Sequence, residues 1–221
     1  MTLSQPHGFL AIPPTGKGPG VLVLHAWWGL NDTMKAFCTR LAESGFTAFA
    51  PDLYHGKVVE DIARAEALSG ALFGDLDQPR ADLADATAFL SQRAGEPERG
   101  LAVMGFSLGA FFALDLSVTA PEHIRSAVVF YGTRPGDYSS SRASYLGHFA
   151  ETDQFEPQSE VDKLEAALRG AGRPVNFHRY SGTGHWFCEP DRPGAFNQAA
   201  ADLAWERTLV FLKEAMFEGT H

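Results

Sequence analysis

Residues 100–116 read GLAVMGFSLGAFFALDL, in which a strand-like apolar run meets a helix-like apolar run at the turn Gly105-Phe106-Ser107-Leu108-Gly109. A serine at the tip of so tight a turn is forced out above the edge of a sheet. Glycine suits positions 105 and 109 because a side chain there would collide with the neighbouring strand or helix. A glycine-rich turn without special function is the alternative interpretation. The position between a buried strand and a helix favours a nucleophilic serine, Ser107.

The composition is that of a single globular domain. The chain has 221 residues, of which 45% are apolar and 20% are charged, and this length is sufficient for one large core. The formal net charge of −9 argues against a phosphate-binding surface and therefore against a nucleic acid partner. There is no internal repeat or linker, so we expect residues 1–221 to form one domain.

Nothing in the sequence indicates export or membrane insertion. Residues 1–20 lack a basic flank and a continuous apolar stretch, both of which a secretory signal requires. The most apolar segment, residues 21–30, is too short to span a bilayer. Two cysteines, Cys38 and Cys188, do not make the framework of a secreted fold, and we interpret both as reduced thiols that fill space in a core. These features predict a cytoplasmic protein with no membrane partner.

Short β-rich apolar runs alternate with helical periods along the chain, which is typical of an α/β fold: a mostly parallel central sheet with helices on both faces. The predicted strands are residues 8–12, 21–27, 46–53, 100–106, 126–132, 145–151 and 175–181. The predicted helices are residues 31–45, 59–73, 79–94, 160–172 and 199–217, together with one that follows Ser107 and ends before Ala120. The polar loop 132–144 is the best candidate for a mobile segment.

Two of the helices carry apolar side chains at helical spacing. In the helix over 31–45, Asn31 or Asp32 is the expected cap and Gly45 the expected end, and the buried side chains should be Met34, Phe37, Cys38 and Leu41. In the last helix, the side chains expected to pack on the sheet are Leu203, Leu209, Leu212 and Met216.

A serine hydroxyl is a weak nucleophile until a base removes its proton. Where a strand, serine and helix follow one another in this way, the acid and then the histidine come after the serine. Asp153 lies in the loop FAETDQFEP, and His185 lies in the glycine-broken loop SGTGHWF after the next strand. Both loops leave the carboxyl ends of strands, where open α/β sheets assemble their sites. Asp153 would hold the His185 imidazole in one tautomer.

Other residues compete for these two roles. His25 and His55 end strands near the expected cleft, but both precede Ser107 and so do not fit the expected order. His148 lies inside an apolar run and is predicted to be a hydrogen-bonded core residue. Glu151 is the alternative to Asp153, because strand alternation keeps the two on one side of the chain.

The anion that forms when Ser107 attacks a carbonyl needs two backbone donors. Leu108 supplies one at the helix N-terminus. The second should come from the loop HAWWGLN, where the amide of Trp27 is the most plausible candidate. Aromatic side chains on the surrounding loops suggest a compact apolar pocket, lined by Trp28, Tyr54, Trp186 and Phe187. The side chains of Trp27 and Trp28 are equally compatible with a core role.

Together these segments resemble the dienelactone hydrolase family of α/β-hydrolases nearly from end to end. The resemblance rests on the segments HAWWGLND, APDLYHGK, GFSLGA, ETDQFEP, GTGHWF and AAADLAWERTLVFL. It implies an α/β-hydrolase fold, a triad of Ser107, Asp153 and His185, and oxyanion amides from Trp27 and Leu108.

Three positions depart from the family's namesake enzymes. Those enzymes carry a cysteine at the position of Ser107 and a glutamate at the position of Ala26, which interacts with the thiol. The two changes are consistent with each other, because an alcohol needs only the histidine for activation, whereas a thiol can store charge. The namesakes also have an arginine for the substrate carboxylate where this chain has Glu189, with Arg192 nearby. A carboxylate at Glu189 would repel a carboxylate on the substrate.

The sequence therefore predicts a serine hydrolase of small carboxylic esters or lactones. No metal or organic cofactor is expected, the partner is a small-molecule substrate, and the protein is expected to be a monomer or a small homo-oligomer. A non-catalytic member of the fold that binds a small ligand is one alternative. A hydrolase of another acyl bond, such as a thioesterase or peptidase, is the other.

Overall fold

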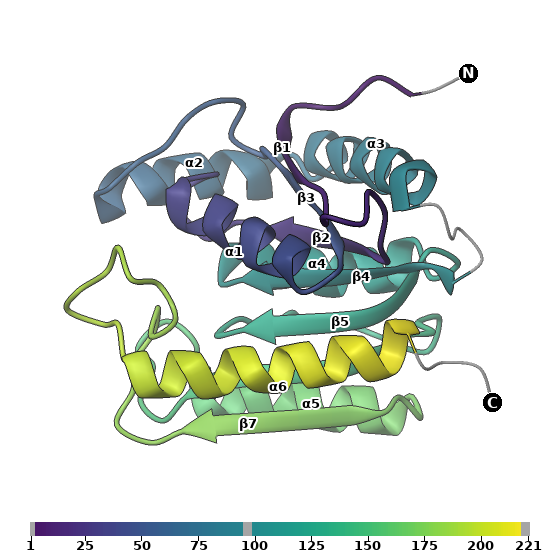
Figure 1. Cartoon of the computed structure of the whole chain (residues 1–221). Coiled ribbons are helices and arrows are strands. Elements are labelled where there is room, and N and C mark those ends of the chain that lie inside the picture. Colours follow the sequence, from purple (N-terminus) through teal and green to yellow (C-terminus); the bar gives the residue numbers. More distant parts are fainter. Residues whose placement is uncertain (1–2, 95–98, 218–221) are drawn as a thin grey trace.

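The computed structural model describes residues 3–94 and 99–217, which form one seven-stranded sheet with helices on both faces (Figure 1). The strand order is β1-β3-β2-β4-β5-β6-β7, with β1 antiparallel to β3 and the remaining pairs parallel. The strands are β1 Gly8–Ala11, β2 Gly20–Leu24, β3 Thr47–Pro51, β4 Leu101–Phe106, β5 Ile124–Phe130, β6 Ser144–Ala150 and β7 Val175–Tyr180. The predicted α/β architecture, a mostly parallel central sheet with helices on both faces, is confirmed.

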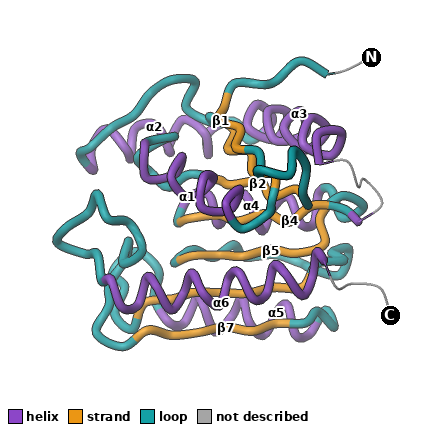
Figure 2. The backbone as a smooth tube through the Cα atoms, in the orientation of Figure 1, coloured by secondary structure: helices purple, strands orange, loops and turns teal. Residues whose placement is uncertain are grey.

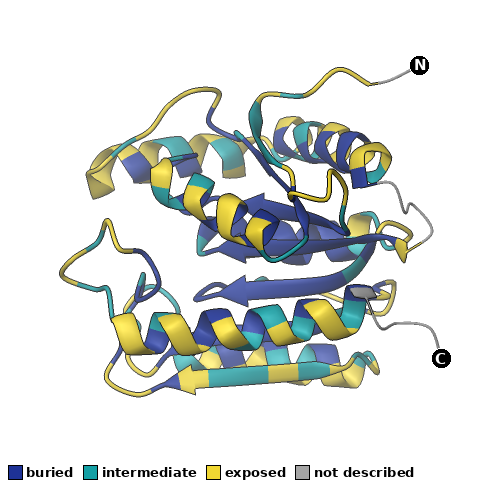
Figure 3. Ribbon diagram, viewed as in Figure 1, coloured by how far each residue is buried: buried dark blue, intermediate teal, exposed yellow. Residues whose placement is uncertain are grey.

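The central strands are buried on both faces, which explains their nearly continuous apolar sequences. Every residue of β2, β3 and β4 is buried, as expected where helices cover a parallel sheet on both sides. The edge strand β7 keeps only Tyr180 buried. Figure 3 shows this difference between the centre of the sheet and its edge.

The helices divide between the two faces. They are α1 Asp32–Glu43, α2 Ile62–Gly74, α3 Asp77–Ala94, α4 Leu108–Thr119, α5 Gln158–Gly170 and α6 Gln198–Phe217. Helices α1 and α6 cover one face, and their apolar side chains join one core cluster. Helices α3, α4 and α5 cover the other face and form a second cluster.

Helix α1 follows its sequence pattern. The Asn31 side chain accepts a hydrogen bond from the Met34 amide at 3.1 Å, and Gly45 has a φ of 98° just beyond the helix end. The four apolar side chains predicted to pack, Met34, Phe37, Cys38 and Leu41, are all buried.

Helix α6 corrects one prediction. Leu212 and Met216 are buried, but Leu203 is 40% exposed. The buried positions Ala204, Thr208, Leu212 and Met216 recur every four residues. Leu203 therefore lies about 100° around the helix from that stripe and faces away from the sheet.

The loop predicted to be mobile is instead anchored. Arg134 at its start pairs with Asp115 of α4 at 3.0 Å, and Arg80 of α3 pairs with the same carboxylate at 2.9 Å. The Tyr138 side chain is buried, and its hydroxyl donates to the Arg134 carbonyl oxygen at 2.7 Å. Buried contacts of this kind oppose local opening.

We expect Asp115→Ala to lower the free energy of unfolding by about 3 kcal/mol, because it leaves two guanidinium groups without their buried carboxylate. The Asp115 side chain is only 2% exposed, whereas Asp162 pairs with Arg179 at the surface. Asp162→Ala is therefore the matched control, with an expected cost below about 1 kcal/mol. Urea unfolding of both variants measures the difference, and equal costs would contradict the structural role assigned to Asp115.

Candidate active site

The turn after β4 holds Ser107 in an unusual backbone conformation. Its φ and ψ are 50° and −110°, a region that non-glycine residues rarely occupy and that is common at functional sites. A Cβ atom at Gly105 would lie 2.2 Å from the Gly109 carbonyl oxygen, and one at Gly109 would lie 2.1 Å from the Leu24 carbonyl oxygen. Only glycine fits at both positions, so α4 packs directly on β4 and β2 and the serine projects from the turn.

Ser107, His185 and Asp153 are hydrogen-bonded in series. Ser107 Oγ lies 2.8 Å from His185 Nε2, and His185 Nδ1 lies 2.7 Å from Asp153 Oδ2. The side chains of His185 and Asp153 are 5% and 2% exposed, so their contact is shielded from water. In sequence the serine and the histidine are 78 residues apart, and the sheet brings them together because β4, β6 and β7 all end at one edge.

The acid in contact with His185 is Asp153 rather than Glu151. Asp153 Oδ1 accepts hydrogen bonds from the Phe155 and Glu156 amides, both at 2.9 Å, which leaves Oδ2 for the imidazole. Glu151 is exposed, and its Oε2 accepts a hydrogen bond from the Gly182 amide at 2.8 Å. Glu151 thus joins the ends of β6 and β7 and does not bond to the histidine.

Glu156 is a site residue that the sequence pattern did not reveal. Its carboxylate accepts hydrogen bonds from the Thr133 amide at 3.0 Å and the Thr133 hydroxyl at 2.6 Å. Burial raises the pKa of Glu156, and the bonds from Thr133 oppose that rise. The pair fastens the Asp153 loop to the loop after β5. Its only sequence signal is an acidic residue three positions after Asp153, which is too common to single out.

The two backbone amides predicted to bind an oxyanion are both free. Ser107 donates its own amide to the Phe130 carbonyl oxygen at 2.9 Å. The hydrogen bonds of residues 3–94 and 99–217 leave the Trp27 and Leu108 amides without an acceptor. Leu108 is the first residue of α4, where amides have no partner within the helix.

Of the four side chains predicted to line a pocket, only Trp186 lines the cavity of about 740 Å³ beside His185. Its ring contacts Phe155, another lining residue, at a centroid distance of 5.0 Å, and Phe155 was not singled out from the sequence. The loop that joins β7 to α6 forms much of this cavity and projects beyond the carboxyl ends of the strands, on the left of Figure 2.

The other three predicted pocket residues are buried and are not part of the lining of this cavity. Phe187 is completely buried between the rings of Tyr131 and Tyr180, at 5.5 and 5.0 Å. Tyr54 is 3% exposed and packs on the ring of His25. Trp28 is 2% exposed because the Arg192 guanidinium lies over its ring at 3.6 Å.

The competing histidines are occupied elsewhere. His25 is fully buried. Its Nε2 accepts a hydrogen bond from the Leu53 amide at 3.2 Å, and its Nδ1 lies 2.8 Å from the Ala26 carbonyl oxygen. His55 is exposed, 3.4 Å from Asp82. His148 is buried and hydrogen-bonded to Tyr180 and Thr208, which confirms its predicted core role.

Glu189 was predicted to face the substrate, but it does not line the cavity beside His185. It is fully buried, and its Oε1 accepts a hydrogen bond from the Tyr131 hydroxyl at 2.8 Å. Burial raises the pKa of this carboxyl to about 8. The expected repulsion of a substrate carboxylate by Glu189 is therefore wrong. Arg192, by contrast, lines the cavity beside His185.

A comparison with solved structures bears on the fold. A putative dienelactone hydrolase from Klebsiella pneumoniae superposes with a TM-score of 0.81 at 24% identity, over 94% of this chain and 92% of that chain. At that identity the likeness concerns the fold, which is that of the α/β-hydrolases.

The family model named "Dienelactone hydrolase family" matches residues 7–216, so the chain belongs to this family of hydrolases. The protein named usf from Aquifex pyrophilus is 32% identical, over 94% of this chain and 92% of its own length. A putative carboxymethylenebutenolidase from Aquifex aeolicus is 29% identical, over 93% of this chain and 92% of its own length. None of the helices within residues 3–94 and 99–217 has the length and hydropathy needed to cross a membrane.

We expect Glu189→Gln to stabilise the protein increasingly as the pH rises from about 4.5 to about 8. In this range the unfolded chain loses the carboxyl proton while the folded protein keeps it, so the stability of the wild type falls with rising pH. The glutamine keeps an acceptor for Tyr131 without this penalty.

The expected gain at pH 8 is about 2–4 kcal/mol, and it should vanish near pH 4.5. Urea unfolding at both pH values measures it. The exposed Glu151→Gln serves as the control and should show no such trend. A gain that does not depend on pH would mean that Glu189 is ionised in the folded protein.

Proposed function

We propose that the protein hydrolyses small carboxylic esters or lactones, with Ser107 as nucleophile, His185 as general base and Asp153 as the acid that orients it. The observation that carries this proposal is the continuous hydrogen-bonded series from Ser107 Oγ through His185 to Asp153 Oδ2, with distances of 2.8 and 2.7 Å. Nucleophilic catalysis by an alcohol requires a base at this distance that is itself oriented by a third group. Membership of a family named for a lactone hydrolase supports the same bond type.

In the first half of the reaction Ser107 Oγ attacks the substrate carbonyl carbon. Because Nδ1–H of His185 donates to Asp153, Nε2 carries the free electron pair and takes the serine proton. The carbonyl oxygen becomes an anion, which the amides of Trp27 and Leu108 stabilise by hydrogen bonds. Collapse of this intermediate breaks the carbon–oxygen bond to the alcohol, which receives the proton from His185.

In the second half a water molecule replaces the alcohol. His185 Nε2 takes a proton from the water as its oxygen attacks the acyl carbon, and the same amides hold the second anion. When this intermediate collapses, the proton returns to Ser107 Oγ and the carboxylic acid leaves. In a lactone the alcohol and the acid are parts of one molecule, so a single hydroxy acid is released.

Two features of the site bear on the substrate. Trp186 and Phe155 give the cavity beside His185 an aromatic wall, which suits an acyl or aryl group of modest size. Arg192 lines the same cavity, but so does Asp191, whose carboxylate lies 3.4 Å from the Arg192 guanidinium. Because the Glu189 carboxyl is buried against Tyr131, an acidic substrate would meet the Arg192–Asp191 pair at this wall rather than Glu189.

We expect Ser107→Ala to lower kcat/KM for a responsive ester by at least about 10⁴-fold, and Asp153→Asn to lower it by about 10⁴-fold through loss of the correct imidazole tautomer. A panel of esters, lactones, thioesters and peptides, tested with wild type and variants, measures both effects. Glu151→Gln should retain activity within about threefold, because the Glu151 side chain accepts a hydrogen bond from the Gly182 amide and is not the carboxylate bonded to His185.

A fluorophosphonate probe separates the enzyme from a non-catalytic binding protein of the same fold. Covalent labelling at Ser107 in the wild type, absent from folded Ser107→Ala, supports the proposal. An unlabelled, folded wild type with no turnover would favour the binding protein. Preferential turnover of thioesters or peptides over esters and lactones would overturn the substrate class and leave the nucleophile intact.

We expect Trp186→Ala to change the ratio of kcat/KM between an aryl ester and a small acetyl ester by about tenfold, because the ring lines the cavity beside His185. Phe187→Leu, in the buried core, is the control and should change stability more than selectivity. An unchanged ratio in Trp186→Ala would remove this ring from the substrate pocket.

A further inference from the structure

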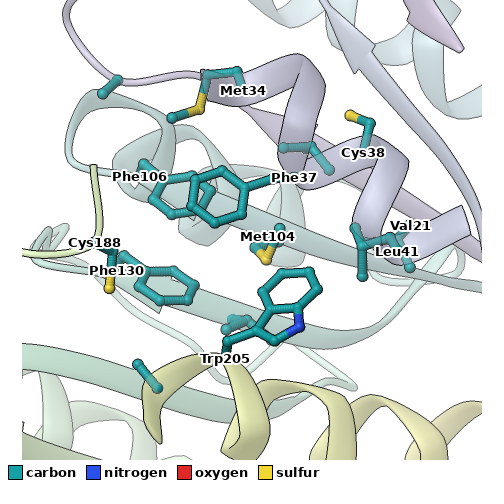
Figure 4. Close-up of a cluster of buried hydrophobic side chains, with 14 of the residues drawn as sticks. Val21, Met34, Phe37, Cys38, Leu41, Met104, Phe106, Phe130, Cys188 and Trp205 are labelled. Atoms are coloured by element: carbon teal, nitrogen blue, oxygen red, sulfur yellow. The ribbon is translucent and has the colours of Figure 1, made fainter. Parts of the chain in front are cut away.

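A second cavity lies between helices α1 and α6, on the face of the sheet that these two helices cover. Its volume is about 230 Å³. The lining includes the rings of Phe37, Phe130, Phe196 and Trp205, with Cys188 and Ala201. Figure 4 shows Phe37, Phe130, Cys188 and Trp205 gathered in this region from α1, β5, the β7–α6 loop and α6.

The interior of this cavity is apolar. Phe130 and Cys188 are 1% and 4% exposed. Burial, and then the nearby Glu189, raise the pKa of Cys188 well above its ordinary value, so its sulfur remains an uncharged thiol at neutral pH and contributes a soft, polarisable surface. An apolar cavity of about 150 Å³ lined by Leu, Ile and Phe stays dry and binds benzene, so this cavity has room for one or two aromatic rings.

The charges at the rim cancel. Arg40 and Asp202 both line the cavity, and the Arg40 guanidinium lies over the Trp205 ring at 4.1 Å. The Gln198 amide donates to Asp202 at 2.8 Å. Arg40 would attract a bound anion and Asp202 would repel it. For a bound cation the two effects are reversed. The rim therefore gives an ion of either sign no net advantage over an uncharged molecule.

We propose that this cavity is a second small-molecule site, separate from the Ser107 site, and that it binds an uncharged, planar aromatic molecule. The rings around it supply offset and edge contacts, and the rim supplies hydrogen-bonding groups for one polar substituent. Its lining does not include Ser107, His185 or Trp186.

The two sites share one wall. Phe196 lines both this cavity and the cavity beside His185. The segment between Phe187 and Asn197 is closed at its base by a hydrogen bond from the Asn197 amide to the Phe187 carbonyl oxygen at 3.0 Å. A ligand held against Phe196 therefore lies against the same short loop that follows His185.

The test is isothermal titration of the full-length protein with phenol and with indole. Benzoate and benzylamine, which are charged at pH 7, are the charge controls. We expect phenol and indole to bind with a dissociation constant on the order of 1 mM or lower, and the two ions to bind at least about tenfold more weakly. The proposal does not depend on catalysis, because no probe is a substrate for hydrolysis.

Ala201→Phe fills the cavity and should weaken phenol and indole binding at least about tenfold. Ala199→Phe, on the same helix but exposed and outside the lining, should leave binding within about twofold. If Ala201→Phe does not fold, Ala36→Phe, which enters the same cavity from α1, replaces it. Three outcomes would each overturn the proposal. The first is binding of phenol and indole that persists after the cavity is filled, and the second is binding of the ions as tight as that of phenol. The third is no detectable binding of phenol and indole at about 10 mM.

Discussion

The close contact between backbones at the β4–α4 turn is the constraint on which the site depends. Gly105 meets Gly109, and Gly109 meets the carbonyl oxygen of Leu24 at the end of β2, at distances that no Cβ atom would tolerate. This contact fixes where α4 starts relative to two strands. The same turn holds Ser107 at a positive φ and is followed directly by Leu108, the first residue of α4. A looser turn would preserve the sheet but would lose the orientation of the hydroxyl.

The remaining parts of the site are loops held to that fixed point by buried polar contacts. Thr133 and Glu156 join the loop after β5 to the loop that carries Asp153. Tyr131 and Glu189 join the end of β5 to the loop that carries His185. The Tyr131–Glu189 bond is buried and the bonds of Thr133 to Glu156 are partly buried, so breaking either contact leaves polar groups that water only partly reaches. The hydrogen bonds among Ser107, His185 and Asp153 therefore belong to a wider network.

The sequence predicted the seven strands and the convergence of three distant side chains, because both depend on patterns that repeat along the chain: apolar runs, and loops at the carboxyl ends of parallel strands. It failed where the outcome depends on the direction of one side chain. Trp186 and Phe187 are adjacent, yet Trp186 lines the cavity and Phe187 is buried; the backbone at Trp186 has a φ of 65°, which the residue pattern did not predict. Glu189 shows the same limit, since a glutamate four residues from the histidine gives no sign that a buried tyrosine will bind it.

Both cysteine thiols of the chain are buried, although the namesakes of the family use a cysteine as nucleophile. This burial is consistent with the proposal that Ser107 is the nucleophile. Cys188 lies three residues from His185, but its thiol points into the core between α1 and α6, and burial keeps its pKa high. Cys38 lies in the same core cluster, where burial likewise raises its pKa. A neutral thiol is a poor nucleophile. Ala26, which stands where the namesakes carry a glutamate, is buried and apolar, so this position supplies no carboxylate beside Ser107. These surroundings are consistent with the proposed nucleophile, an alcohol whose proton His185 removes during attack.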